Sequence, residues 1–239
     1  MQKYLITGGN GRFATELKKI LKDKKNFIFF DKKNFDITDR KQISSVLNKY
    51  KPNSVIHLAG LSRPMISHEK NIQKSIALNI LGTGNIVLEC EKRNIKVIYF
   101  STNYVYPGKK GNYDENAPLL PMNNYAWSKL GGEAAVQMYK NSLILRVAMT
   151  ESPWVHPFAF SNLKINFLYH DEVTKLLPKI LKKKGIINLG GNENSIFKFA
   201  KETNNKVRKI LYSKKTSNVV MPQNSTIDIS KLKKMLKTK

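Results

Sequence analysis

The sequence contains a single cysteine, few acidic residues and no long apolar run. Because Cys90 cannot form an internal disulfide, a disulfide-stabilised extracellular scaffold is excluded and a reducing cytoplasm is expected. No apolar stretch approaches the roughly 20 residues that a membrane-spanning helix needs, so we expect no membrane segment. Met1 is followed almost at once by a predicted strand, and we therefore expect no signal peptide.

Acidic side chains are scarce, with 17 Asp and Glu against 42 Lys and Arg, which gives a formal net charge of +25. Only six of the basic residues are arginine, the residue type that reads nucleic-acid bases through paired hydrogen bonds, and the lysines are scattered. We interpret the charge as a lysine-rich composition that draws anionic substrates, and we expect no nucleic-acid or membrane partner. No His or Cys pair stands at metal-ligand spacing, so we expect no metal site.

The first motif is a strand, a glycine-rich turn and a helix. Residues 3–7 have the pattern of a buried strand, and residues 13–22 have a helical pattern. Between them, Gly8 and Gly11 and the small Ala14 fit a dinucleotide-binding turn, where glycines let the backbone approach a pyrophosphate at a helix N-terminus. The residues of this turn that we expect to contact a cofactor are Gly8, Gly11, Arg12 and Phe13.

Asp31 ends the next predicted strand, about 20 positions after the glycines, where an acidic side chain binds the ribose 2′-hydroxyl of a dinucleotide. A carboxylate repels the 2′-phosphate of NADP and so favours NAD. Lys32 and Lys33 follow directly and offset that repulsion, so both NAD and NADP stay open as the cofactor.

Strand and helix alternate along the first two thirds of the chain. Strands are predicted at 26–30, 54–58, 95–100 and 143–146, with helical segments between them. This alternation predicts an α/β fold with a Rossmann-like, doubly wound parallel sheet. The 54–58 strand ends at Leu58 and leads into Ala59 and Gly60, small residues that suit the close passage of a cofactor. We expect Leu58, Ala59 and Gly60 to contact the cofactor. His57 lies in the same apolar run and is interpreted as a packed core residue.

Tyr125 and Lys129 stand four residues apart in a predicted helix, and therefore on one face of it. An ammonium beside a phenol lowers the pKa of the phenol toward the range that acid–base catalysis needs. The 95–100 strand leads into Ser101 and Thr102, at the carboxyl edge where open α/β sheets bind ligands. Asn79, in the helical segment before that strand, is either solvated or bonded to backbone or water near this edge.

In their order and spacing these elements resemble the extended short-chain dehydrogenase/reductase family, of the NAD-dependent epimerase/dehydratase type. Within that family, the dTDP-4-dehydrorhamnose reductases are most similar. The motifs that carry the resemblance are GGNGRFA, DITD, HLAG, STNYVYPG and YAWSK. The resemblance implies NAD(P)-dependent reduction of a 4-keto group on a nucleotide-linked deoxysugar, as in cell-surface polysaccharide synthesis.

The resemblance also implies residue roles. Tyr125 would be the general acid, Lys129 would hold the nicotinamide ribose, and Thr102 would bond the substrate oxygen. Asn79 would support a proton relay through water. The remaining residues implied by the family are an adenine pocket at Asp36 and Ile37 and substrate contacts at Asn103 and Tyr104.

Departures from the family pattern leave alternatives open. Related dehydratases carry an Asp–Glu pair where this chain has Asn103 and Tyr104, so water elimination is not expected. A sugar-nucleotide 4-epimerase remains an alternative, as does a non-catalytic, cofactor-binding regulatory subunit. A homodimer is also left open.

The domain boundary is expected near residue 146. Residues 1–146 would form the NAD(P)-binding Rossmann domain, and residues 147–239 a reduced substrate lobe interleaved with the last Rossmann elements. A helix is expected at 230–237. The aromatic residues of the reduced lobe either stack on a ligand or fill a small hydrophobic cap, and we favour the cap. These residues are Trp154, His156, Phe158 and Phe160.

Overall fold

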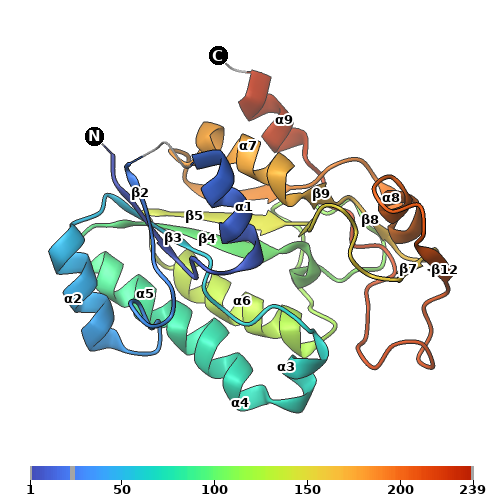
Figure 1. Ribbon diagram of the computed structural model, residues 1–239, viewed down its shortest axis with the longest axis horizontal. Helices are drawn as coiled ribbons and strands as arrows, with labels where there is room; N and C mark the ends of the chain where they lie inside the picture. Colours follow the sequence, from blue (N-terminus) through green and yellow to red (C-terminus); the bar gives the residue numbers. More distant parts are fainter. Residues whose placement is uncertain (1, 22–24, 238–239) are drawn as a thin grey trace.

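The computed structural model describes residues 2–21 and 25–237. One end of the predicted helix 13–22 and one end of each predicted domain, 1–146 and 147–239, therefore lie outside the described residues; these ends are Lys22, Met1 and Lys239. Within them, six parallel strands form one sheet in the order β10-β5-β4-β3-β1-β2 (Figure 1). The strands are β1 (Tyr4–Thr7), β2 (Phe27–Phe29), β3 (Ser54–His57), β4 (Lys96–Thr102), β5 (Ser142–Val147) and β10 (Gly185–Leu189). The prediction of a doubly wound α/β sheet is confirmed.

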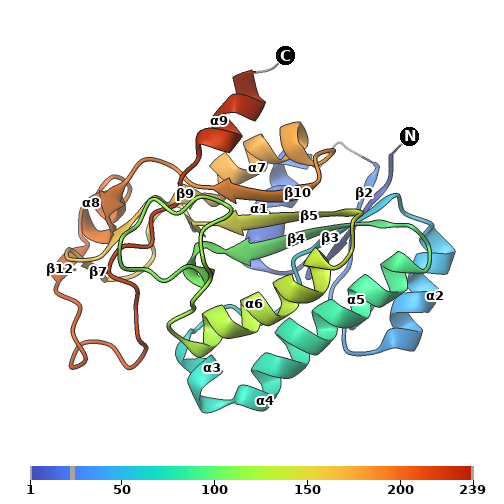
Figure 2. The same ribbon diagram turned by 180° about the vertical axis from the view of Figure 1, so that it is seen from behind.

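Helices cover both faces of the sheet (Figures 1 and 2). On one face lie α1 (Arg12–Leu21) and α7 (His170–Ile180), which contact each other. On the other lie α2 (Arg40–Tyr50), α5 (Gly82–Glu91) and α6 (Asn124–Gln137). A chain of short helices precedes α5: α3 (Ile66–Lys70), α4 (Ile72–Ser75) and the π-helix η1 (Ile76–Leu81).

The core consists of two apolar layers separated by the sheet. Successive residues of a strand point to opposite faces, so Ile98 packs toward α1 and α7 while Val97 packs toward α2 and α5. Because both faces are covered, the strands are apolar without alternation, as β4 illustrates with every residue buried. This is why the strands were recognisable as short continuous apolar runs.

A small lobe follows β5 and has its own apolar core. Its elements are β6 (Met149–Thr150), β7 (Phe158–Phe160), β8 (Lys164–Ile165), β9 (Leu168–Tyr169), β11 (Asn194–Ser195), α8 (Ile196–Lys201) and β12 (Arg208–Ile210). Between β9 and β11 the chain returns to the large sheet and forms α7 and β10. The last described helix, α9 (Ser230–Lys237), contacts β10. The domain boundary at residue 146 stays a prediction.

Trp154 belongs to the core of this lobe and is 8% exposed. The His156 ring lies edge-on to it at 5.3 Å. Phe158 is exposed, with the Arg208 guanidinium 4.4 Å from its ring centroid. At Trp154 the cap interpretation therefore holds, while Phe158 faces outward on β7.

Among the described residues, no helix is long and apolar enough to cross a membrane.

Candidate active site

A cleft of about 400 Å³ opens at the carboxyl ends of β1, β3, β4 and β5. This is the edge of a parallel sheet at which ligands bind, because the loops after the strands diverge there. It brings together most of the residues that the sequence analysis singled out. Those that line it are Gly8, Gly11, Arg12, Phe13, Leu58, Ala59, Gly60, Thr102, Asn103, Tyr104, Tyr125 and Lys129.

The glycine turn closes tightly against the end of β3. Gly8 has a φ of +67°, and a Cβ there would come within 2.7 Å of the Ala59 backbone nitrogen. Only glycine meets both conditions without strain. The turn is closed by a hydrogen bond from the Gly11 amide to the Gly8 carbonyl at 2.8 Å, and α1 begins one residue later. The N-terminus of α1, with its unpaired N–H groups, therefore faces the cleft.

Helix α6 carries Tyr125 and Lys129 into the cleft from one face. The helix begins at a well-formed cap, where the Asn123 side chain accepts a hydrogen bond from the Ala126 amide at 2.9 Å. The Lys129 ammonium lies 4.1 Å from the centroid of the Tyr99 ring, and the Tyr99 hydroxyl donates to the Lys129 carbonyl at 3.0 Å. Lys129 is thus fixed at both its backbone and its charged end by β4.

Burial dominates the electrostatics of these two residues. It lowers the pKa of Lys129 to about 7, an effect that the Glu133 carboxylate opposes. It raises the pKa of Tyr125, while a hydrogen bond with Thr102 and the charge of Arg63 act in the lowering direction. The prediction that a nearby lysine sets a lowered pKa for Tyr125 is therefore wrong in this structure. The Lys129 ammonium is directed at the Tyr99 ring, and desolvation of the phenol outweighs the favourable charges.

Thr102 ends β4 and places its hydroxyl beside Tyr125. The Thr102 oxygen accepts a hydrogen bond from the Tyr104 amide at 3.2 Å. Asn103 is 3% exposed and donates its amide to the Ser225 carbonyl at 2.8 Å, which ties this edge of the cleft to the C-terminal segment. The Tyr104 ring stands edge-on to Tyr125 with the ring centroids 6.4 Å apart.

Asn79 does not line the cleft. It lies in η1, is 2% exposed, and donates to the Leu61 carbonyl at 2.9 Å and to the Ser128 hydroxyl at 2.8 Å. Its oxygen accepts from the Leu61 amide at 2.7 Å. Of the two interpretations from the sequence, bonding to backbone is the one observed. Asn79 joins the loop after β3 to α6, and the proton-relay role stays a prediction.

Asp31, Asp36 and Ile37 also lie outside the described lining of the cleft. The Asp31 carboxylate accepts from the backbone and side-chain nitrogens of Asn34 at 3.0 and 2.9 Å. Asp36 bonds Thr38, and Ile37 is 4% exposed in the core. The Gly9 amide donates to the Phe30 carbonyl at 2.6 Å, so Asp31 follows directly on a residue bonded to the glycine turn.

An arginine–glutamate cluster in the lining of the cleft was not predicted from the sequence, although Arg12 was expected to contact a cofactor. Glu151, just after β6, pairs with Arg12 at 3.1 Å and with Arg63 from the loop after β3. Both arginines and Glu151 line the cleft. Arg63 and Glu151 lie 88 positions apart, and a local pattern could not have joined them. The available signal was an arginine three residues after Gly60, in the loop that follows the third strand.

His57 and Cys90 are structural. His57 is 1% exposed, bonded to Thr7 at 2.8 Å and to Thr83 at 3.1 Å, and burial lowers its pKa to about 3. The prediction of a packed core histidine is confirmed. Cys90 is a buried free thiol whose pKa burial raises. The described residues include no cluster of His, Cys, Asp and Glu suited to a metal ion.

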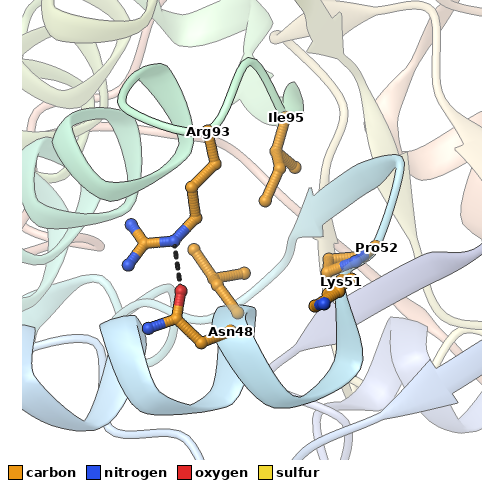
Figure 3. Close-up of a pocket in the computed structure, with 6 residues that line it drawn as sticks. Asn48, Lys51, Pro52, Arg93 and Ile95 are labelled. Carbon is orange, nitrogen blue, oxygen red and sulfur yellow. Dashed lines mark hydrogen bonds between the residues drawn. The ribbon is translucent and has the colours of Figure 1, made fainter.

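A second cavity of about 360 Å³ lies at the opposite, amino-terminal edge of the sheet, between α2 and α5 (Figure 3). Its residues are Leu47, Asn48, Lys51, Pro52, Arg93 and Ile95. The Arg93 guanidinium points across it to the Asn48 oxygen at 2.9 Å and pairs with Glu89 at 2.9 Å. Arg93 thus links the end of α2 to the end of α5 across the cavity.

The fold and cleft define the class of Rossmann-like α/β proteins with a ligand cleft at the carboxyl edge of the sheet. The model of the RmlD substrate binding domain family matches residues 2–167, and the chain belongs to that family.

The chain is also similar to individual proteins. A dTDP-4-dehydrorhamnose reductase of Aggregatibacter actinomycetemcomitans is 27% identical over 169 residues, which cover 69% of this chain and 57% of the relative. The spore coat polysaccharide biosynthesis protein SpsK of Bacillus subtilis is 30% identical over 165 residues, with coverages of 68% and 56%. The matches thus span little more than half the length of these relatives.

The fold is shared with a solved structure. It is dTDP-4-dehydrorhamnose reductase from Bacillus anthracis in complex with NADP, which superposes with a TM-score of 0.84. The sequences are 21% identical, and the match covers 98% of this chain and 91% of the other. At this identity the likeness establishes the fold.

Proposed function

We propose that the protein is an NAD(P)-dependent oxidoreductase that reduces a 4-keto group on a nucleotide-linked deoxysugar, in cell-surface polysaccharide synthesis. One observation carries the proposal: Tyr125, Thr102 and Lys129 converge in the cleft that the glycine turn also lines. The family assignment and the relatives named for dTDP-4-dehydrorhamnose reductase support the reaction type and the substrate class.

The residues fit a nicotinamide dinucleotide. Gly8 leaves room for close approach of a ligand to the backbone, and the N-terminus of α1 favours the negative charge of a pyrophosphate. Asp31 is proposed for the adenosine ribose, with Asp36 and Ile37 near the adenine. A bound NAD or NADP would supply the hydride.

The chain's own residues hold and move the proton. A carbonyl oxygen that gains negative charge needs a donor within hydrogen-bond reach, and we assign this role to the Tyr125 hydroxyl. Its raised pKa keeps the phenol protonated at neutral pH, which is the form that donates. Thr102 is assigned the second hydrogen bond to the same oxygen, and Lys129 is assigned the nicotinamide ribose. Asn103 and Tyr104 are proposed to contact the sugar.

The test is NAD(P)H consumption with a dTDP-4-keto-6-deoxysugar. Tyr125→Phe should abolish turnover and leave cofactor affinity almost unchanged, because the phenol acts on the substrate oxygen. Tyr139→Phe is the matched control, since its hydroxyl bonds the Ile95 carbonyl away from the cleft. Equal turnover in Tyr125→Phe and wild type would refute the assignment. Cofactor that survives purification would favour the 4-epimerase, and cofactor binding without turnover the regulatory subunit.

We further propose a homodimer formed through the outer face of α5 and α6. Leu88 on α5 and Trp127 on α6 are exposed by 48 and 49%, and α5 and α6 pack side by side (Figure 2). Leu81, which ends η1 just before α5, and Met138, which follows α6, are exposed by 59 and 87%. An apolar surface of this kind on two adjacent helices suits a second copy of the chain. Light scattering should show a dimer that Trp127→Glu dissociates, and a monomeric wild type would refute the proposal.

A cytoplasmic location is proposed because Cys90 is a free thiol.

A further inference from the structure

The short helix α3 is packed against the first turn of α6, and two consecutive residues make the contact. His68 is fully buried, and its ring lies edge-on to the Tyr125 ring with the centroids 5.2 Å apart. Glu69 accepts a hydrogen bond from the Asn124 amide at 3.0 Å. One side chain therefore holds the ring of the proposed acid, and the next holds the backbone from which that ring extends.

The His68 ring is itself fixed. Its Nδ1 is bonded to the Ser75 hydroxyl at 2.7 Å, and Ser75 is 2% exposed on α4. Burial lowers the pKa of His68, so the ring is neutral at neutral pH and presents an uncharged edge to the phenol. Other charges that act on it are Glu69 on its own helix and Lys129 on α6. None of the roles assigned above to residues of the cleft uses this histidine.

The phenol ring also contacts Tyr104, with the ring centroids 6.4 Å apart. Its ring plane is nearly perpendicular to that of Tyr125, at 88°. Edge-to-face contacts between aromatic rings are favourable and directional. Tyr125 therefore contacts two rings from different segments, and a large rotation of the phenol would change both contacts.

We propose that His68 and Glu69 are positioning residues that fix the phenol of Tyr125 in the direction of the reacting carbonyl. The inference deepens the proposed function and rests on it for its kinetic consequence. It assigns no chemistry to His68: the histidine acts through Tyr125. The ring contact sets the rotation of the phenol, and the Glu69 carboxylate sets the position of the helix turn.

The expected consequence is a loss of kcat without a loss of cofactor affinity. A reacting group displaced by about 1 Å can lose on the order of 100-fold in rate, because the reactive geometry is reached less often. His68→Ala should therefore lower kcat by roughly 10- to 100-fold while KM for NAD(P)H stays within about twofold. Glu69→Gln keeps a hydrogen-bond acceptor and should lower kcat less than Glu69→Ala.

The experiment separates positioning from folding through a matched variant. His68→Phe combined with Ser75→Ala keeps an aromatic edge against Tyr125 and leaves no buried hydroxyl without its partner. Ser75→Ala alone measures what the loss of that hydroxyl contributes by itself. The double variant should recover most of the kcat lost in His68→Ala. Equal rates in His68→Ala and wild type, or no recovery in the double variant, would overturn the proposal.

A spectroscopic readout keeps the proposal testable if turnover is absent. In protein with isotope-labelled tyrosines, the NMR signal of the Tyr125 ring is assigned by its loss in Tyr125→Phe. Because a neighbouring ring shifts such a signal, His68→Ala should move it, and the double variant should keep an aromatic shift. An unmoved Tyr125 signal overturns the positioning role. Absence of turnover in wild type with a moved signal refutes the proposed function alone.

Discussion

Removal of the Glu133 carboxylate should destabilise the fold more than any surface charge. Glu133 is fully buried, and Arg146 is 2% exposed. Two guanidinium nitrogens of Arg146 donate to one Glu133 oxygen at 3.0 and 2.6 Å, and Ser101 donates to the other oxygen. Glu133→Gln leaves a buried guanidinium without its counter-charge, although Tyr106 still accepts from it at 2.8 Å. Breaking a buried pair from one side costs about 3–5 kcal/mol.

That cost is a large part of the roughly 5–15 kcal/mol that stabilises a domain, so the variant should fold but unfold at much lower urea concentration. Urea titration followed by circular dichroism measures the loss, and an unchanged slope shows that the unfolded state is not altered. Asp171→Asn is the matched control, because its partner Lys175 is 66% exposed and such pairs contribute less than about 1 kcal/mol. The double variant Glu133→Leu/Arg146→Met should recover much of the loss. A loss below about 1 kcal/mol in Glu133→Gln would contradict the reasoning.

Three further predictions concern residues around the cleft. Asn79→Ala leaves the Leu61 amide and carbonyl without their partner. It should lower the free energy of unfolding by about 1–3 kcal/mol in a urea titration and speed hydrogen exchange at the Leu61 amide. Unchanged exchange would contradict the role of Asn79 in joining the loop after β3 to α6. Asp31→Ala should shift the ratio of cofactor affinities toward NADP, and an unchanged ratio in binding titrations would refute the ribose assignment. His57 has a folded pKa of about 3 against an ordinary 6.5, so the unfolded state binds a proton that the folded state refuses. Its contribution to stability is complete above pH 6.5 and falls with pH, by roughly 3 kcal/mol at pH 4. In His57→Gln the free energy of unfolding should depend less on pH below 6.5 than in wild type. Equal pH dependence in the two proteins would contradict the burial argument.

The sheet and the position of its ligand edge could be predicted because their signals are local. The inner strands are runs of apolar residues covered on both faces, and two of these runs lead into small or hydroxyl residues, Ala59 and Thr102. The Gly8–Gly11 spacing and the Tyr125–Lys129 spacing are likewise local, because each depends on the geometry of one turn. Residues at the carboxyl ends of neighbouring parallel strands lie along the same edge of the sheet, where ligands bind.

What could not be predicted depends on partners distant in sequence. Asn79 carries the polar side chain expected of a relay residue, but it is committed to Leu61 and Ser128, 18 and 49 positions away. The pKa of Tyr125 depends on burial, which a four-residue spacing does not report. The small lobe has strands of only two or three residues, and at that length the alternation of side chains gives no usable signal.

Helix α6 explains why chemistry and packing are coupled in this protein. It brings Tyr125 and Lys129 to the cleft, and its other faces contact residues that do not line the cleft. Ser128 is held by Asn79, and Glu133 is held by Arg146 on β5. A displacement of any of these contacts moves the helix as a unit, because its backbone hydrogen bonds link successive turns. Substitutions at such contacts should therefore lower kcat through the position of the phenol before they unfold the chain.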